Sequence, residues 1–309
     1  MFKEFRIEKQ SETTEKSIQR LKTALQEADA VVLGAGSGLS AAAGYLYDGE
    51  RFERYFKDFI EKYGIADMYS GGFYPFYSLE EYWAWWSRHI WINRYAPIPS
   101  ELYTELFNVI REKDYFVLTT NVDHCFQRAG FDKQRMFYTQ GDYGLWQCSR
   151  PCHHKTYDNE ETVRKMLLAQ GFVIEEDGTL TVSDWKTIRM AVPSELVPHC
   201  PRCGRPMTMN LRADDTFVED TGWQRASNRY YEFLSKHEGQ KIVYWEIGVG
   251  YNTPGIIKYP FWRMTAKNPD ATYVCMSRRY ADYPDEIHEK SIGITGNIET
   301  ILKAMQTTI

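Results

Sequence analysis

The chain has 309 residues, of which 43% are hydrophobic and 26% are charged, and its formal net charge at pH 7 is −5. This length and composition are ordinary for a globular protein with one large domain and a smaller module, or with two domains, and they exclude a mainly disordered protein. The acidic balance offers no basic excess to neutralise a phosphate backbone, so nucleic acid is a poor candidate partner.

The N-terminus lacks the apolar core of a secretion signal in residues 1–6, and we find no run of about 18 apolar residues anywhere in the sequence. The sequence therefore indicates a cytoplasmic protein with no membrane partner. Six cysteines in so long a chain are better candidates for metal ligands or buried thiols than for a disulfide framework.

Residues 11–27 are predicted to form an amphipathic helix, because Ile18, Leu21 and Leu25 fall on one stripe. A short apolar run follows from Ala30 and breaks into a glycine loop and an alanine-rich, helix-compatible segment, a strand–loop–helix junction. Glycines let a backbone approach a ligand closely, and a helix N-terminus favours phosphate. An ordinary tight turn is the alternative, because Leu39 stands where a dinucleotide fingerprint needs glycine.

The next segments differ in character. Residues 45–52 show no clear period and are predicted to form a loop over whatever the glycines bind. Residues 69–95 are very rich in aromatic side chains and are predicted to form helices that pack on one another. These aromatic residues either line a substrate groove or bury area within a compact helical module, and the second is commoner. His89, surrounded by tryptophans, is expected to be packed and not catalytic.

A helix capped by Ser100 is predicted next, and the strand 115–119 follows it. That strand ends in the polar cluster Thr120-Asn121-Val122-Asp123-His124. Because open α/β sheets bind ligands at the carboxyl ends of their strands, this cluster is a candidate binding segment. Residues 137–142 are predicted to form another strand-to-loop junction.

Two closely spaced cysteine pairs come next, Cys148 with Cys152 and Cys200 with Cys203. They bracket an acidic stretch, residues 158–177, that we expect to be irregular. Two such pairs are typical of a zinc ribbon, in which four thiolates hold one structural zinc ion and leave no open coordination position. A histidine is the alternative to one of the cysteines as ligand, and the candidates are His153, His154 and His199. The isolated Cys125 and Cys275 are expected to be buried.

Three further strands are predicted, over residues 241–247, 271–276 and 291–295. The first ends in Gly248-Val249-Gly250 and the second in Ser277, so both ends are candidate ligand loops. Asn297 is then expected to cap a closing helix. Its apolar stripe consists of Ile298, Ile301, Leu302 and Met305.

Taken in order, these motifs resemble the sirtuins over nearly the whole chain. The resemblance rests on Gly34-Ala35-Gly36, Thr120-Asn121-Val122-Asp123, the Gly141 loop, the two cysteine pairs, and the late Gly248 and Ser277. It implies an α/β fold: a Rossmann-like domain with a parallel sheet flanked by helices, a smaller zinc-binding and helical domain, and NAD in the cleft between them.

The resemblance also implies domain limits. We expect the Rossmann-like NAD-binding domain in residues 1–44, 96–142 and 213–309. We expect an NAD cover loop and aromatic helical module in residues 45–95, and a zinc-binding module in residues 143–212.

One departure from the common sirtuins decides the expected chemistry. Where they carry a histidine that acts as general base, this chain has Gln140. An amide does not titrate near neutral pH, so Gln140 can orient a hydroxyl but cannot take its proton. The pattern is similar to the class M sirtuins of microbes, which implies a protein ADP-ribosyltransferase and not an efficient deacylase.

The resemblance implies a role for each candidate residue. Asp123 would hold the nicotinamide carboxamide, Asn121 would bind the ribose side or an ordered water, and Gln140 would orient a hydroxyl. Arg212 would supply a cation, unless it is an ordinary solvated arginine. Further NAD contacts are expected from Gly34, Ala35, Gly36, Leu39, Ser40, Gly248, Val249, Ser277 and Ile298.

Partners are also implied by the resemblance alone. A lipoyl-carrier protein of the glycine-cleavage H type would be the acceptor, and a macrodomain hydrolase would reverse the modification. Two alternatives stay open: weak NAD-dependent deacylation, and a non-catalytic sensor of NAD or ADP-ribose.

Overall fold

The computed structural model describes residues 12–306. Its Cα positions divide into two compact units, which are treated separately below. Unit 1 contains the described parts of Met1–Gly44, Ser100–Gln140 and Gly222–Ile309. Unit 2 contains Tyr45–Pro99 and Gly141–Thr221, and so holds both the aromatic segment and the two cysteine pairs.

Unit 1 is built on a six-stranded sheet in which every neighbouring pair is parallel. The strand order is β11-β10-β9-β1-β2-β3. Nearly every residue of these strands is buried, as expected for a sheet covered on both faces. The bounds are β1 Ala30–Ala35, β2 Tyr115–Thr119, β3 Met136–Tyr138, β9 Ile242–Ile247, β10 Thr272–Ser277 and β11 Ser291–Thr295.

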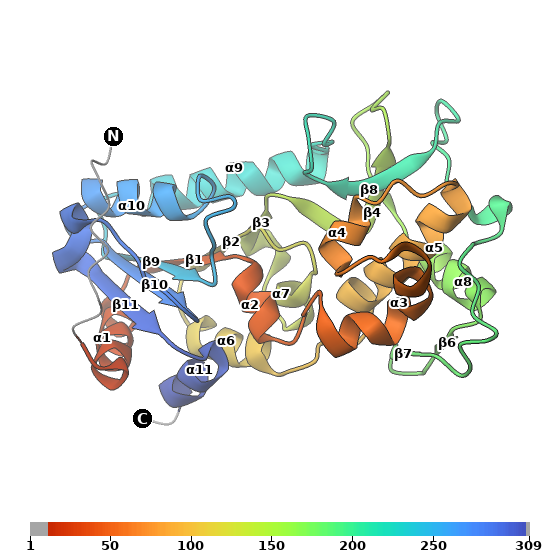
Figure 1. The fold of residues 1–309 in the computed structure, drawn as a ribbon. Coiled ribbons are helices and arrows are strands. Elements are labelled where there is room, and N and C mark those ends of the chain that lie inside the picture. The colour runs from red at the N-terminus through yellow and green to blue at the C-terminus, as the bar shows by residue number, and fades with distance from the viewer. Residues whose placement is uncertain (1–11, 307–309) are drawn as a thin grey trace. The chain divides into compact units, whose positions relative to one another are not determined.

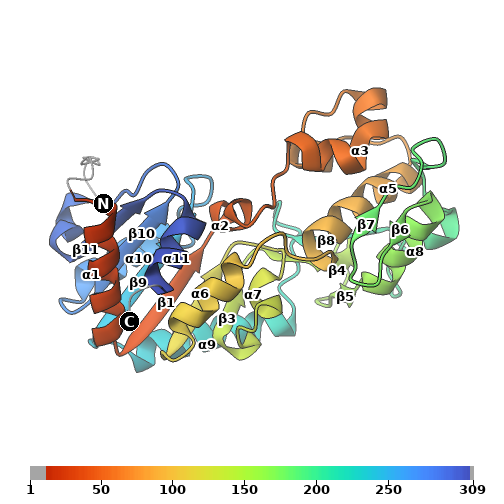
Figure 2. The same ribbon diagram turned by 90° about the horizontal axis from the view of Figure 1, so that it is seen from below.

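Helices lie on both faces of this sheet (Figure 1). One face is covered by α9 Thr221–Lys236 and α10 Lys258–Lys267, and the other by α1 Thr14–Glu27, α6 Leu102–Ile110 and α11 Ile298–Gln306 (Figure 2). Shorter helical segments are α2 Ser37–Ala42, α7 Cys125–Arg128, Lys133–Arg135 and Asp285–Lys290. The predicted α/β class, with a parallel sheet between helices, is confirmed.

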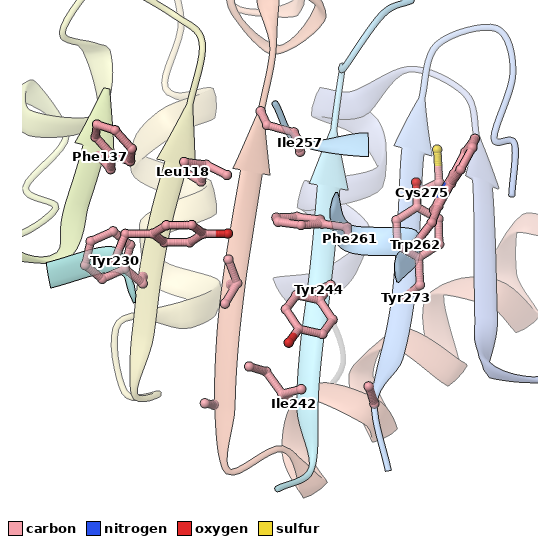
Figure 3. Close-up of a cluster of buried hydrophobic side chains, with 14 of the residues drawn as sticks. Leu118, Phe137, Tyr230, Ile242, Tyr244, Ile257, Phe261, Trp262, Tyr273 and Cys275 are labelled. Carbon is pink, nitrogen blue, oxygen red and sulfur yellow. The ribbon is translucent and has the colours of Figure 1, made fainter. Parts of the chain in front are cut away.

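The core under α9 and α10 is aromatic (Figure 3). Tyr230 from α9 and Phe261 and Trp262 from α10 pack on strand residues such as Leu118 and Tyr244. Tyr244 and Phe261 have their ring centroids 5.3 Å apart. Burial of such rings is the main stabilising term for a sheet of this kind.

Unit 2 combines helices with a small antiparallel sheet of order β5-β4-β8 and a two-stranded ribbon, β6-β7. The strands are β4 Gly141–Cys148, β5 Tyr157–Asp158, β6 Val173–Ile174, β7 Leu180–Thr181 and β8 Met207–Leu211. The helical segments are α3 Gly49–Tyr63, α4 Met68–Gly72, α5 Leu79–Ile90, the π-helical turn Trp91–Tyr95, α8 Glu160–Gln170 and Ser194–Leu196.

The aromatic segment is helical and mostly packed, as predicted. Trp83 and Trp85 have no exposed surface, and His89 is 2% exposed. The ring of Trp85 contacts those of Phe56 and Phe59, with centroids 4.3 and 5.2 Å away. These rings therefore form the core that joins α3 to α5.

Two segments predicted to be irregular each contain part or all of a helix. Within residues 45–52, α3 begins at Gly49. Most of its apolar stripe lies after residue 52, so residues 45–52 alone show no helical period. The stripe consists of Phe52, Tyr55, Phe56 and Phe59. Within residues 158–177, α8 carries Glu160 and Glu161 in its first turn, where the helix dipole favours acids. Its buried stripe consists of Val163, Met166, Leu167 and Gln170.

Smaller differences concern element ends. The first helix begins at Thr14 and is capped by Thr13, and Ser11 lies outside the described residues. Glu101, and not Ser100, is the N-cap of α6, although Ser100 Oγ accepts the Leu102 N–H at 3.4 Å. Gly141 and Asp142 begin β4 and do not form a loop. The predicted Asn297 cap of α11 is confirmed, with Oδ1 accepting the Thr300 N–H at 3.0 Å. None of the helices in residues 12–306 has the length and apolar character needed to cross a bilayer.

Gly34, in the middle of β1, makes possible the close packing of α10 on the sheet. A Cβ at this position would lie 2.4 Å from Ile257 Cγ2 and 2.6 Å from Phe261 Cε2. We expect Gly34→Ala to lower the free energy of unfolding by about 1–3 kcal/mol, because the added methyl group would overpack the core at this position. Urea denaturation measures this change. Gly255→Ala is the matched control, since a Cβ at Gly255 meets nothing within 4 Å. Equal stability of the two variants would contradict the packing argument.

Candidate NAD site and zinc cluster

The candidate NAD residues of unit 1 gather at one edge of its sheet. Because all six strands are parallel, their carboxyl ends share that edge. Strand order reverses between β1 and β9: the chain moves outward from β1 to β2 and β3, and later returns to β9 on the other side of β1. In open α/β sheets, such a switch point is where ligands bind. The loops that meet there begin at Gly36 and Gly248.

These two loops touch through their backbones. Gly36 donates its N–H to Ile247 O at 3.1 Å, and Gly38 donates its N–H to Gly248 O at 2.9 Å. Gly248 has φ +62, and a Cβ there would lie 2.3 Å from the Leu39 nitrogen. The glycines are thus required by contact within the protein, in addition to any ligand that lies on them.

Asn121, after β2, is held by three hydrogen bonds. Its backbone N–H is donated to Thr119 Oγ1 at 3.0 Å. Its amide nitrogen Nδ2 donates to Gly36 O at 3.0 Å and to the Tyr103 hydroxyl at 3.3 Å. Both amide hydrogens are therefore used within the protein, and the side-chain oxygen is the atom that remains to accept a hydrogen bond from a ligand.

Asn121 and Asp123 are connected through Tyr103 and Ser40. The Tyr103 hydroxyl lies 2.9 Å from Ser40 Oγ, and Ser40 Oγ lies 2.5 Å from Asp123 Oδ2. An ionised carboxylate only accepts hydrogen bonds, so Ser40 donates to Asp123 and Tyr103 donates to Ser40. The chain of hydrogen bonds thus runs in one direction, from Asn121 to Asp123. Burial, together with the charge of Asp123, raises the pKa of Tyr103 well above its usual value, which keeps its hydroxyl proton in place.

Asp123 is only 6% exposed, and its other oxygen, Oδ1, accepts the Cys125 N–H at 3.0 Å. The next residue, His124, has φ +65 and is the only non-glycine residue with positive φ in the part of the chain that the structure describes. Left-handed backbone at a side chain of this kind is unfavourable and is often found at functional sites.

The remaining NAD candidates lie at or near the same edge. Leu39 and Ser40 are buried in α2. Val249 follows Gly248, and Ser277 ends β10. Ser277 O accepts the Gly296 N–H at 3.0 Å, which places it beside the loop that leads to the buried Ile298. Gln140 is half-buried and ends the Ser100–Gln140 segment of unit 1, two residues after β3.

Arg212 lies in unit 2, just after β8. Its Nη2 donates to Glu219 Oε1 at 2.6 Å, and its guanidinium lies 4.3 Å from the centroid of the Phe217 ring. Arg212 is therefore a cation held in place by an ion pair and a ring. Its proposed role in catalysis stays a prediction.

The four paired cysteines come together in unit 2. Their Sγ atoms, from Cys148, Cys152, Cys200 and Cys203, all lie within 4.8 Å of one another. Cys148 and Cys203 have their Sγ atoms 3.6 Å apart, and Cys152 and Cys200 have theirs 3.7 Å apart. Zinc–sulfur bonds of about 2.3 Å in a tetrahedron place sulfurs about 3.8 Å apart, so the arrangement suits zinc.

The neighbouring histidines do not join this cluster. His153 Nδ1 is 3.0 Å from Cys152 Sγ, but its Nε2 is 2.8 Å from the Tyr157 hydroxyl. His199 Nδ1 is 2.8 Å from Val197 O, and His154 is exposed. Cys125 and Cys275 are buried away from the four, as predicted.

Tyr103 and Thr119 take part in the hydrogen bonds around Asn121 and were not among the predicted residues, whereas His124 belongs to the predicted polar cluster. Thr119 directly precedes the polar cluster, so its position in the sequence was a usable signal. Tyr103 gave no such signal in the sequence, because it is a buried ring in the apolar helix α6.

Two curated relatives are similar to this chain, whereas no protein-family model matches it. The first, a "Protein ADP-ribosyltransferase" of Staphylococcus aureus (strain Mu50 / ATCC 700699), is 40% identical over 288 residues, which cover 93% of this chain and 86% of the relative. The second, a "Probable bifunctional ADP-ribose hydrolase/ADP-ribosyltransferase" of Fusarium oxysporum f. sp. cubense, is 30% identical over 255 residues, which cover 80% of this chain but only 40% of the relative.

Solved sirtuin structures share the fold. The structure described as "Structural Basis for the Mechanism and Regulation of Sir2 Enzymes" has a TM-score of 0.51 and 15% identity, with 94% of this chain and 96% of that one covered. A Sir2Tm structure with a propionylated peptide has a TM-score of 0.51 and 16% identity, with 94% and 97% covered. Together with the fold, the glycine loop and the cysteine cluster, these similarities show that the chain belongs to the sirtuin family, among its NAD-dependent protein ADP-ribosyltransferases.

Proposed function

We propose that this protein transfers ADP-ribose from NAD to a protein acceptor and releases nicotinamide. The observation that carries the proposal is the directed hydrogen-bond chain from Asn121 to Asp123 at the switch point of the sheet, combined with an amide at Gln140. The chain fixes the groups that would bind NAD, and the amide removes the base that deacylation needs.

In the first step, the bond between the nicotinamide nitrogen and ribose C1′ breaks, and its electron pair leaves with nicotinamide. The ribose then resembles an oxocarbenium ion. Asp123 would hold the nicotinamide carboxamide, and the side-chain oxygen of Asn121 would accept a hydrogen bond from the ribose side or from an ordered water. Because both side chains are already oriented, little conformational freedom is lost when NAD binds.

In the second step, a nucleophile of the acceptor bonds to C1′, and its proton is released to water. Gln140 would orient a hydroxyl of the ribose but has no site that takes a proton near neutral pH. The deacylase route needs a ribose hydroxyl to be activated by a base, so it stalls at this point. The lack of a base at Gln140 does not block the transfer of ADP-ribose to an acceptor nucleophile that needs no activation by this protein.

We infer that the acceptor is a lipoylated carrier protein of the glycine-cleavage H type and that a macrodomain hydrolase reverses the modification. The class M resemblance supports both partners. The fungal relative, whose name joins an ADP-ribose hydrolase to an ADP-ribosyltransferase and of which this chain covers 40%, supports the hydrolase. We also infer one structural zinc ion on the four cysteines, which would supply folding free energy and no chemistry.

Incubation with labelled NAD and a lipoylated carrier is expected to label the carrier. Asp123→Asn is expected to lower the rate by about 100-fold, because the buried carboxylate and its fixed donors are disturbed. The control Asp270→Asn changes an exposed turn after α10 and should keep the rate. Nicotinamide release without labelled protein, whatever acceptor is offered, would contradict the transferase. Stabilisation by NAD with no nicotinamide after long incubation would point to the sensor.

Gln140→His is expected to raise deacylation of an acyl-lysine peptide by at least about tenfold, because a general base typically contributes more than that. The assay follows deacylated peptide by mass spectrometry. Gln134→His makes the same substitution at an exposed position and should leave the rate unchanged. If the native protein deacylates as fast as the Gln140→His variant, the argument from the missing base is wrong.

Metal analysis is expected to find one zinc per chain in gently purified protein. Cys200→Ser should lose that zinc and reduce stability, since a structural zinc site contributes directly to folding. Cys125→Ala should retain it, because Cys125 is buried outside the cluster. A content well below one zinc per chain in the unaltered protein would defeat the four-cysteine assignment.

A further inference from the structure

A buried ion pair joins the two ends of the loop after β9, residues 248–257, in unit 1. Glu246 lies near the end of β9, before this loop, and Lys258 begins α10 directly after it. Lys258 Nζ lies 2.5 Å from Glu246 Oε1, and the two side chains are 2% and 1% exposed. Glu246 Oε2 also accepts the Tyr273 hydroxyl at 2.8 Å. The ends of the loop are thus held together by charges that the transfer reaction does not use.

Stability alone does not account for this pair. A cation in the first turn of a helix meets the positive end of the helix dipole. Both buried charges have also lost their water, and apolar side chains of similar size often replace a buried ion pair without loss of stability. What the pair specifies is geometry, because Lys258 reaches Glu246 only when α10 begins at this place beside β9.

Lys258 also supports the ring of Tyr251, which lies within the loop. Its Nζ is 5.2 Å from the centroid of that ring, a distance typical of a cation–π contact. The Tyr251 hydroxyl donates to Asp282 Oδ2 at 2.8 Å. Asp282 is buried and lies in the segment that follows β10. Tyr251 therefore joins the loop after β9 to the segment after β10.

Both joined segments carry candidate NAD residues. Val249 lies two residues before Tyr251, and Ser277 ends β10 ahead of Asp282. A Cβ on Gly36 would lie 2.9 Å from Val249 Cα, so the loop after β9 closely approaches the glycine loop after β1. Because one residue separates Val249 from Tyr251, displacement of the ring would shift the backbone at this close approach. The hydrogen bond to Asp282 therefore fixes the loop at the edge of the sheet where ligands bind in such folds.

We propose that Tyr251 is a positioning residue for NAD, held in place by Lys258 and Asp282. The inference rests on the proposed function, because NAD is the co-substrate of that reaction. If the loop were free to move, only a fraction of the molecules would present the binding geometry, and the apparent affinity would fall by that fraction. Tyr251 thus acts on the binding of NAD, whereas the chemical step depends on Asn121 and Asp123.

The Kd of NAD is measured by calorimetry on the full-length protein, and kcat and KM are taken from nicotinamide release. Tyr251→Phe keeps the ring over Lys258 but removes the hydroxyl. It is expected to raise Kd and KM about tenfold, since the lost hydrogen bond is to a charged group. Its kcat should stay within about twofold, because binding and not chemistry is affected. The matched control, Tyr280→Phe, removes a hydroxyl from a 70% exposed ring two residues before Asp282 and should change neither constant.

Substitutions at both ends of the hydrogen bond test the bond itself. Asp282→Ala is expected to raise Kd as Tyr251→Phe does, and the double variant should bind NAD no more weakly than the weaker of the two single variants. Asp282→Asn retains an oxygen that can accept from the Tyr251 hydroxyl and should recover most of the affinity. Independent effects that multiply in the double variant would overturn the inference.

Thermal unfolding of each variant separates positioning from stability. A lower melting temperature of Tyr251→Phe with an unchanged Kd would make Tyr251 a structural residue only and would overturn its proposed role, as would a lower kcat at unchanged KM. An unaltered protein that binds NAD but releases no nicotinamide would contradict the transferase, and the Kd values would still decide the role of Tyr251. An unaltered protein that does not bind NAD would overturn both.

Discussion

The backbone contact between the loop after β1 and the loop after β9 determines the geometry of the candidate NAD site. Gly38 donates to Gly248 O, and a Cβ on Gly36, Gly38 or Gly248 would lie less than 3.0 Å from the opposite backbone. This contact fixes the start of α2, which carries Ser40 to Asp123. Any side chain here would push the two loops apart, so the hydrogen bonds that end at Asp123 depend on glycine at these positions.

The hydrogen-bond chain that follows has a direction because its two ends differ in chemistry. Asn121 begins it with an amide that donates, and Asp123 ends it with a carboxylate that accepts. The hydroxyls of Tyr103 and Ser40 between them have no freedom to reverse while Asp123 is ionised. A buried carboxylate without hydrogen-bond donors would lower the stability of the fold. Here Ser40 donates to Asp123, and Tyr103, which donates to Ser40, also accepts from the amide of Asn121 and so orients it. Removal of either end would therefore disturb the other.

The sequence predicted the sheet edge well because each strand there is an apolar run that stops at glycine or polar residues. This pattern alone placed Asn121, Gly248 and Ser277 at the ends of β2, β9 and β10, where the structure has them. Tyr103 was not found, since a buried ring in an apolar helix has the same pattern whether or not its hydroxyl reaches a site. The helices α3 and α8 were not predicted, because each begins with charged residues that precede its apolar stripe. The packed structure shows which face of each helix is buried.

Gln140 occupies a position where the backbone is fixed on both sides. Thr139, before it, donates its N–H to Thr119 O at 3.0 Å. Gly141, after it, has φ +97, and a Cβ there would lie 1.9 Å from Asn210 O. A substitution at residue 140 therefore changes the chemical group presented there but not the path of the chain. Exchange of a base for an amide at this position would redirect the second step of the reaction while the residues that support the first step, Asn121 and Asp123, stay as they are.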